Sequence, residues 1–167
     1  QQYNKTTALW ATLMLLCSLH FIASNNDVRA EPFLTGMIIA AVYHFSNSLK
    51  SFFSWHLVAA TAFTAMAMMT KGPFTLVPIG GALAGQLLFK QDWKQLFHPR
   101  WLLMLVLLTV FISPELYSLW YQFDQHPEKI IFGGTNVSGI RFFLWDSQFG
   151  RFFNSGPIKG KGDPFFF

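Results

Sequence analysis

The sequence predicts an all-α integral membrane protein: a multi-spanning helical bundle with a long external loop that carries short amphipathic helices. Of the 167 residues, 52% are apolar and 12% are charged, whereas an ordinary soluble domain has about 25% charged residues. Aromatic residues make up 18% of the chain, which is more than the interior of a soluble domain of this size can bury. Five apolar segments also approach the length of a membrane span.

These five segments are the predicted spans. A transmembrane helix needs about 20 mostly apolar residues, within a range of roughly 17 to 25, so the first, third and fifth segments are long enough and the second and fourth are short. None of them has the charged face that a helix of a soluble bundle shows. The segments cover about residues 7–23, 33–45, 53–70, 74–89 and 101–120.

The distribution of Lys and Arg between the spans predicts which side faces the cytoplasm. Arg29 and Lys71 are the basic residues of the short loops on one side. The other side is richer in basic residues and is therefore assigned to the cytoplasm: Lys5, Lys50, Lys90, Lys94 and Arg100.

Residues 121–164 form the predicted external loop, and the next span is expected to begin at residue 165. The loop is rich in glycine and long for a passive connection. Within it, the segment Ile140 to Phe153 mixes aromatic and polar residues and could lie in the membrane interface with its aromatic side toward lipid. Because the chain starts with Gln1 and stops within an apolar run, we interpret it as an interior fragment of a longer protein.

Several function classes are excluded by composition and by missing motifs. The net charge is +4, but the basic residues are not clustered as in a nucleic-acid-binding protein. A single cysteine, Cys17, allows no intrachain disulfide and no thiolate metal site. The histidines have no metal-ligand spacing, and no Walker loop, GxSxG or dinucleotide motif occurs.

The loop Ser24 to Pro32 contains the first candidate residues, Asp27, Arg29 and Glu31. The four-residue spacing of Asp27 and Glu31 places both on one face if they lie on or beside a helix start. Acids at a helix start also cap free amides and complement the helix dipole. Both a capping role and a catalytic or ligand-binding role are therefore consistent with this loop.

Lys71 is the second candidate. It precedes Gly72 and Pro73 between two apolar segments, and proline suits the first turn of a helix, so a tight helical hairpin is predicted here. The hairpin does not require a lysine. A cation on the side that the positive-inside tendency disfavours indicates an anionic partner, and the alternative is a side chain that snorkels toward lipid headgroups.

Arg151 is the third candidate, because it lies in an aromatic run and arginine binds phosphate bidentately. Lys159 and Lys161 follow on a glycine-rich stretch. These cations could equally contact anionic lipid headgroups without specificity. The combination of acids and phosphate-binding cations on one face favours an enzyme site.

Three patterns together carry a family resemblance: the Thr70-Lys71-Gly72-Pro73 hairpin, the W-x-x-x-F-x-R-F run of Trp145 to Phe152, and the Pro-Phe-aromatic start of the next span at Pro164. With the acidic external loop, they resemble the polyprenyl-phosphate-dependent glycosyltransferases. More narrowly, they are similar to bacterial members related to protein O-mannosyltransferases and to the aminoarabinose transferase of lipid A. The chain differs from these at Glu31, where Asp is more common, and at Ser147 and Gln148, where an acid–His pair is usual.

The resemblance implies a GT-C fold in the bacterial inner membrane, with the active site on the external, periplasmic face. It implies transfer of a sugar from a polyprenyl-phosphate donor to a lipid, protein or glycan acceptor, with no nucleic acid as partner. By this resemblance Glu31 corresponds to a family acid before a span, and Lys71 and Arg151 correspond to cations near the carrier phosphate. The chemistry of the transfer adds Asp27 as a second catalytic acid that could orient the acceptor, and Arg29 as a third cation for the phosphate. The principal catalytic acid would lie upstream of Gln1, so the fragment alone would be inactive.

No cofactor is implied, and a divalent cation is left open, because the acids could be metal ligands or simple hydrogen-bond acceptors. Two rival classes stay in view. A non-enzymatic transporter or lipid flippase would need polar residues that line a path through the spans, and these spans have few. A structural subunit would show small-xxx-small packing motifs, such as Gly81 to Gly85.

Overall fold

The computed structural model describes residues 4–26, 29–49 and 54–150. Every regular element in these residues is helical, which confirms the predicted all-α character for the part described. The chain divides into two compact units, Gln1–Gly36 and Met37–Phe167. Each unit is described by itself below.

The first unit contains α1 (Lys5–Leu16), α2 (Leu19–Asn26) and the beginning of α3 (Glu31–Ser48). The first predicted span is thus divided between two helices. The break has a local cause, because the Ser18 hydroxyl accepts a hydrogen bond from the Phe21 amide at 3.4 Å. A serine that caps a new helix start competes with continuation of the preceding helix.

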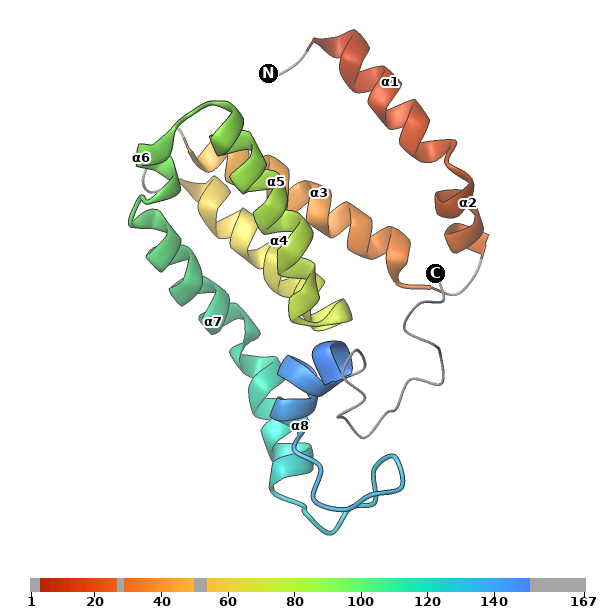
Figure 1. Ribbon diagram of the computed structural model, residues 1–167. Helices are drawn as coiled ribbons and strands as arrows, with labels where there is room; N and C mark the ends of the chain where they lie inside the picture. The colour runs from red at the N-terminus through yellow and green to blue at the C-terminus, as the bar shows by residue number, and fades with distance from the viewer. Residues whose placement is uncertain (1–3, 27–28, 50–53, 151–167) are drawn as a thin grey trace. The chain divides into compact units, whose positions relative to one another are not determined.

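The second unit is a bundle formed by the rest of α3 together with α4 (Trp55–Lys71), α5 (Leu76–Phe89) and α7 (Arg100–Leu119) (Figure 1). A 3₁₀ turn, η1 (Pro73–Thr75), precedes α5, and the short α6 (Trp93–Leu96) leads to α7. One buried cluster joins α3, α4 and α5: Ala41, Phe45, Leu57, Ala60, Ile79 and Leu83. A second, named the α4–α7 cluster below, consists of Ala65, Met68, Leu108 and Ile112.

The buried face of α4 consists largely of small residues, which lets α7 approach closely. Two of them are threonines: the Thr61 hydroxyl donates to the Leu57 carbonyl and the Thr64 hydroxyl donates to the Ala60 carbonyl, both at 2.8 Å. Because these hydroxyls bond within their own helix, they can be buried without an unpaired polar group.

Pro114 lies inside α7 and cannot donate the usual hydrogen bond to the carbonyl four residues earlier, which belongs to Val110. The Ser113 hydroxyl donates to that carbonyl instead, at 2.8 Å. This replacement is one of the ways in which a proline is accommodated in a helix in apolar surroundings, and it allows α7 to continue to Leu119.

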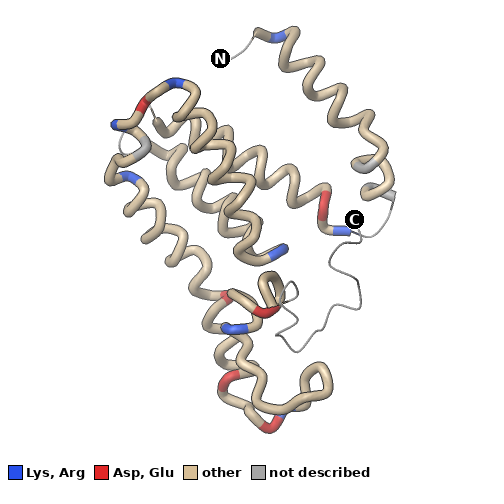
Figure 2. The backbone as a smooth tube through the Cα atoms, viewed as in Figure 1, with Lys and Arg blue, Asp and Glu red and all other residues tan. Residues whose placement is uncertain are grey.

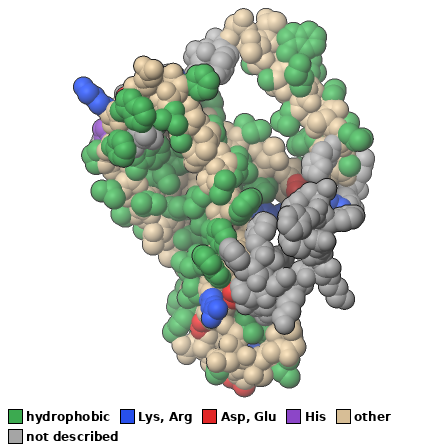
Figure 3. Space-filling model, viewed as in Figure 1, with side chains coloured by type: hydrophobic (Ala, Val, Ile, Leu, Met, Phe, Trp, Pro, Cys, Tyr) green, Lys and Arg blue, Asp and Glu red, His purple; other side chains and the backbone are tan. Residues whose placement is uncertain are grey.

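Charged residues are concentrated at the two ends of the bundle, and the middle of α4, α5 and α7 carries none (Figure 2). The face of α7 that points away from the bundle is also apolar, since Leu102, Leu105, Val106 and Val110 are exposed. Figure 3 shows hydrophobic side chains over the visible surface of the bundle. A helix that is apolar on its packed and its open face is typical of a lipid environment.

Within the described residues, one helical stretch, Trp93–Asp124, is long and apolar enough to cross a membrane, and Pro73–Phe89 is a shorter apolar helix. This is a statement of length and composition only. The other predicted spans stay a prediction at this point.

The Gly81 to Gly85 motif lies on α5 but does not serve as a packing surface among the described residues. A Cβ atom added at Gly81 or at Gly85 would meet nothing within 4 Å. The close helix contact that such a motif permits is made instead by the small residues of α4.

Arg100 ties the C-terminal end of α3 to the start of α7. Its side chain is only 3% exposed, and its Nη1 donates to the Ser48 carbonyl at 2.7 Å. Ser48 is the last residue of α3, so the guanidinium occupies a carbonyl that has no partner within the helix.

We expect Arg100→Met to lower the free energy of unfolding by about 1.5–3 kcal/mol, the usual contribution of a hydrogen bond to a charged group, because the buried Ser48 carbonyl loses its donor. Thermal unfolding in detergent micelles measures the change. Lys94→Met, at an exposed position, is the control and should shift stability by no more than about 0.5 kcal/mol. Equal midpoints for the two variants would contradict the assigned role of Arg100.

Candidate site at the Lys71 turn

The turn between α4 and α5 is built as the sequence predicts. α4 ends at Lys71, Gly72 has φ 81° and ψ −174°, and Pro73 begins η1. This combination of φ and ψ is essentially restricted to glycine. The Gly72 amide donates to the Met68 carbonyl at 2.6 Å, and the Thr75 hydroxyl donates to the Gly72 carbonyl at 3.0 Å.

The segment after α7 returns to the bundle through two short elements. The helix of α7 continues as a π-helix, η2 (Trp120–Asp124), beyond the predicted end of the fifth span. After a turn region, α8 (Gly139–Arg141) and a second π-helix, η3 (Phe142–Gly150), follow. The helical part of the predicted external loop therefore lies where the sequence placed the amphipathic segment, and residues from 151 onward lie outside the described part.

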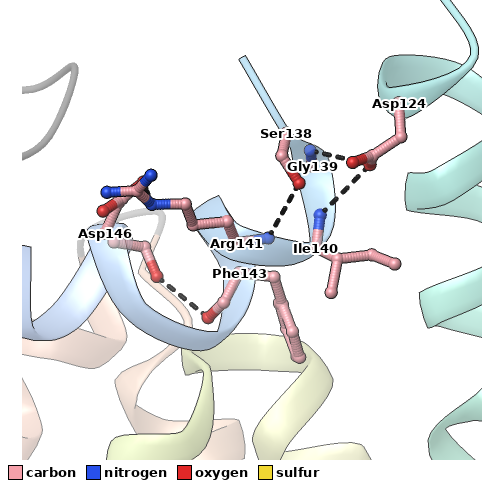
Figure 4. A network of polar contacts seen from close by, with 8 residues as sticks. Asp124, Ser138, Gly139, Ile140, Arg141, Phe143 and Asp146 are labelled. Carbon is pink, nitrogen blue, oxygen red and sulfur yellow. Dashed lines mark hydrogen bonds and ion pairs between the residues drawn. The ribbon is translucent and has the colours of Figure 1, made fainter.

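Asp124 and Ser138 fix the start of α8 (Figure 4). Asp124 Oδ2 accepts from the amides of Gly139 at 3.0 Å and Ile140 at 3.4 Å, and Ser138 Oγ accepts from the Arg141 amide at 3.2 Å. A Cβ atom added at Gly139 would lie 2.8 Å from a ring carbon of Phe123. Only glycine allows this close approach to the end of α7.

The π-helix η3 is docked on the Lys71 turn by one apolar and one polar contact. Phe143 packs against the α4–α7 cluster. Gln148 Nε2 donates to the main-chain carbonyl of Lys71 at 2.5 Å, a contact between residues 77 positions apart. A Cβ atom added at Gly72 would lie 2.9 Å from Gln148 Nε2, so the absence of a side chain at Gly72 makes room for Gln148.

Asp146 is buried in η3, with 6% of its surface exposed. Its Oδ2 lies 3.6 Å from Arg141 Nε (Figure 4). Its Oδ1 is buried and has no hydrogen-bond partner among the described residues. Leu144 and Trp145 are exposed, whereas Phe143 packs against the α4–α7 cluster. The segment therefore combines exposed apolar side chains with a buried carboxylate, and whether its exposed side lies in the membrane interface stays a prediction.

The residues predicted for the site fall into three groups. Lys71 is the exposed last residue of α4 and belongs to the second unit. Arg29 is exposed and Glu31 is the half-buried first residue of α3, and both belong to the first unit. Asp27 and Arg151 lie outside the described residues.

Sequence reasoning missed the contact of Gln148 with the Lys71 turn and the burial of Asp146, which counted only as one of the acids that could be a metal ligand or a hydrogen-bond acceptor. The sequence showed Gln148 only as a position where the chain differs from the family pattern. No local pattern could reveal its hydrogen bond to a carbonyl 77 positions away. Asp146 did leave a signal, since it is an acid in the middle of an aromatic run, between Trp145 and Phe149.

A histidine pair lies at the opposite end of α4 from Lys71. His44 Nδ1 and His56 Nδ1 are 2.8 Å apart, and the rings of Trp55 and Phe63 lie 5.0 Å and 5.8 Å from that of His44. Two side chains are fewer than the three or four protein ligands of ordinary zinc sites. The described residues contain no group of three or more His, Cys, Asp or Glu that could hold a metal ion.

We expect Gly72→Ala to destabilise the protein by about 1–3 kcal/mol, because alanine is strained at this backbone conformation and its Cβ would displace Gln148. Thermal unfolding in detergent measures the effect. Gly81→Ala is the matched control, since it lies in α5 with open space at its Cβ and should be neutral or stabilising by up to about 1 kcal/mol. A tolerated alanine at both positions would refute the tight fit at Gly72.

Comparison with known families gives one match. A sequence model of the dolichyl-phosphate-mannose-protein mannosyltransferase family matches residues 1–118. The matched region includes Arg29, Glu31 and Lys71 and ends before α8 and η3. No curated protein and no solved structure matches the chain.

Proposed function

The chain belongs to the dolichyl-phosphate-mannose-protein mannosyltransferase family, a family of membrane glycosyltransferases, and on this premise we propose its donor, its active-site face and its site residues. The proposed reaction moves a sugar from a polyprenyl-phosphate carrier to a hydroxyl or phosphate of a lipid, protein or glycan acceptor. The proposed fold is a multi-pass GT-C bundle in the bacterial inner membrane, open on the periplasmic face.

The contact between Gln148 and the Lys71 carbonyl is the observation that supports a site at this end of the bundle. It joins the two sequence patterns on which the family resemblance rests, the Thr70–Pro73 hairpin and the aromatic run that contains Arg151. In the sequence, Arg151 follows Gln148 by three residues.

The chemistry assigns a role to each cation and acid. The acceptor oxygen attacks the anomeric carbon, the bond from that carbon to the carrier phosphate breaks, and the acceptor proton passes to a carboxylate. Lys71, Arg151 and Arg29 would stabilise the negative charge that grows on the departing phosphate. Glu31 and Asp27 would orient the acceptor or support a further acid as general base.

The proposed orientation of the chain in the membrane is tested with single cysteines in a Cys17→Ser background. We expect Phe74→Cys and Glu128→Cys, at exposed positions, to react with an impermeant maleimide from the periplasmic side. Lys94→Cys should react only from the cytoplasmic side, because one predicted span separates it from each of the other two positions. Labelling of all three from one side would refute the proposed crossings.

The reaction is tested with the complete protein in lipid vesicles and a panel of radiolabelled polyprenyl-phosphate sugars. We expect Lys71→Ala to lower the rate of transfer by about 100-fold or more, as expected for loss of a group that stabilises developing charge. Glu31→Gln should abolish transfer, because it removes a carboxylate proposed to orient the acceptor or to support the general base.

Lys90→Ala is the matched control, because it removes an exposed lysine from the other end of α5 and should leave the rate unchanged. Full activity in Lys71→Ala would remove this lysine from the site. If a folded and inserted wild-type protein consumes no donor, a transporter or lipid flippase becomes the better interpretation.

A further inference from the structure

We propose that Gln148 is a positioning residue of the Lys71 site. Its side-chain amide donates a hydrogen bond to the main-chain carbonyl of Lys71 at the C-terminal end of α4, and this bond allows an anionic phosphate to lie beside Lys71. The inference rests on the phosphate-binding role proposed above for Lys71. Gln148 acts through the turn and does not need to touch the substrate.

A phosphate at this position faces an electrostatic difficulty. The C-terminal end of a helix carries a partial charge of roughly −0.5, because its last carbonyls have no partner within the helix. Lys71 is the last residue of α4, so an anion bound by it lies at the helix end that repels anions, in contrast to the usual anion sites at helix N-termini. Donors that form hydrogen bonds with these carbonyls weaken the repulsion between the helix end and the phosphate.

The turn supplies such donors one after another. The Met68 carbonyl accepts from the Gly72 amide at 2.6 Å, and the Gly72 carbonyl accepts from the Thr75 hydroxyl at 3.0 Å. These two donors belong to the hairpin itself. The carbonyl of Lys71 accepts from Gln148 Nε2 at 2.5 Å, so the donor closest to the lysine comes from η3.

Two features hold Gln148 in this place. Gly72 adopts a backbone conformation that other residues rarely take, and a Cβ atom there would lie 2.9 Å from Gln148 Nε2. On the other side, Phe143 packs against the α4–α7 cluster and anchors η3. A π-helix is rare and occurs often at functional sites, which agrees with a segment shaped to aim one side chain at the turn.

The inference has a signature that depends on charge. A polyprenyl-phosphate sugar carries one negative charge on its phosphate, whereas the released polyprenyl phosphate carries two above a second pKa of about 6. Gln148 should therefore matter more for the released carrier at pH 8 than at pH 5.5. Gln148→Glu keeps the size but replaces the donor by a negative charge, Gln148→Leu removes the polar amide without adding a charge, and Gln148→His keeps an N–H donor.

The experiment measures binding of a polyprenyl monophosphate to the complete protein in detergent micelles by calorimetry at both pH values. At pH 8 we expect Gln148→Glu to bind about tenfold or more weakly, Gln148→Leu about threefold more weakly, and Gln148→His within about twofold of the wild type. At pH 5.5 the loss in Gln148→Glu should shrink to about threefold or less. A merely structural role would weaken binding equally at both pH values.

Gln122→Glu is the matched control, because it adds the same charge at an exposed position in η2 and should leave binding unchanged. Wild-type affinity in Gln148→Glu at pH 8, or an equal loss at both pH values, would overturn the inference. If Gln148→Glu does not fold, the affinities of Gln148→Leu and Gln148→His for polyprenyl monophosphate at pH 8 are compared. Equal affinities of these two variants would overturn the inference. The proposed function fails in a different way, when the wild-type protein binds no polyprenyl monophosphate.

Discussion

The turn from Lys71 to Pro73 is the constraint on which the candidate site depends. It reverses the chain between α4 and α5 without a connecting loop, and this requires a residue with the backbone conformation of Gly72. The same glycine leaves the space in which Gln148 reaches the Lys71 carbonyl. One backbone position thus fixes the helix hairpin, the location of the lysine and the docking of a segment far along the chain.

The bundle around this turn is organised by the need to satisfy polar groups in apolar surroundings. The Thr61 and Thr64 hydroxyls bond to their own helix, and the Ser113 hydroxyl replaces the bond that Pro114 cannot make. At the end opposite Lys71, Ser46 donates to Gln86 Oε1 at 2.7 Å and links α3 to α5. Unpaired backbone or hydroxyl groups are costly where water is scarce, so these four hydroxyls lie where an acceptor is within hydrogen-bond distance.

Much of the fold could be predicted from the sequence, because apolar segments, prolines and glycines act locally. The hairpin at Pro73 and the helical segment after α7 are found where the sequence placed them. The break at Ser18 and the continuation of the α7 helix to Asp124 were not predicted. Helix ends are poorly encoded inside apolar runs, since a single side-chain hydrogen bond decides where one helix stops and the next begins.

The sequence by itself determined the family, the helical class and Lys71 as a candidate, because composition, Thr70–Pro73 and the surrounding charges are properties of short segments. Only the tertiary structure decided that Gln148 lies on the Lys71 turn, that Asp146 is buried, and that α4 rather than Gly81 to Gly85 supplies the close helix contact. These contacts join residues far apart in the chain. Their geometry follows from how helices pack, and no short sequence pattern records it.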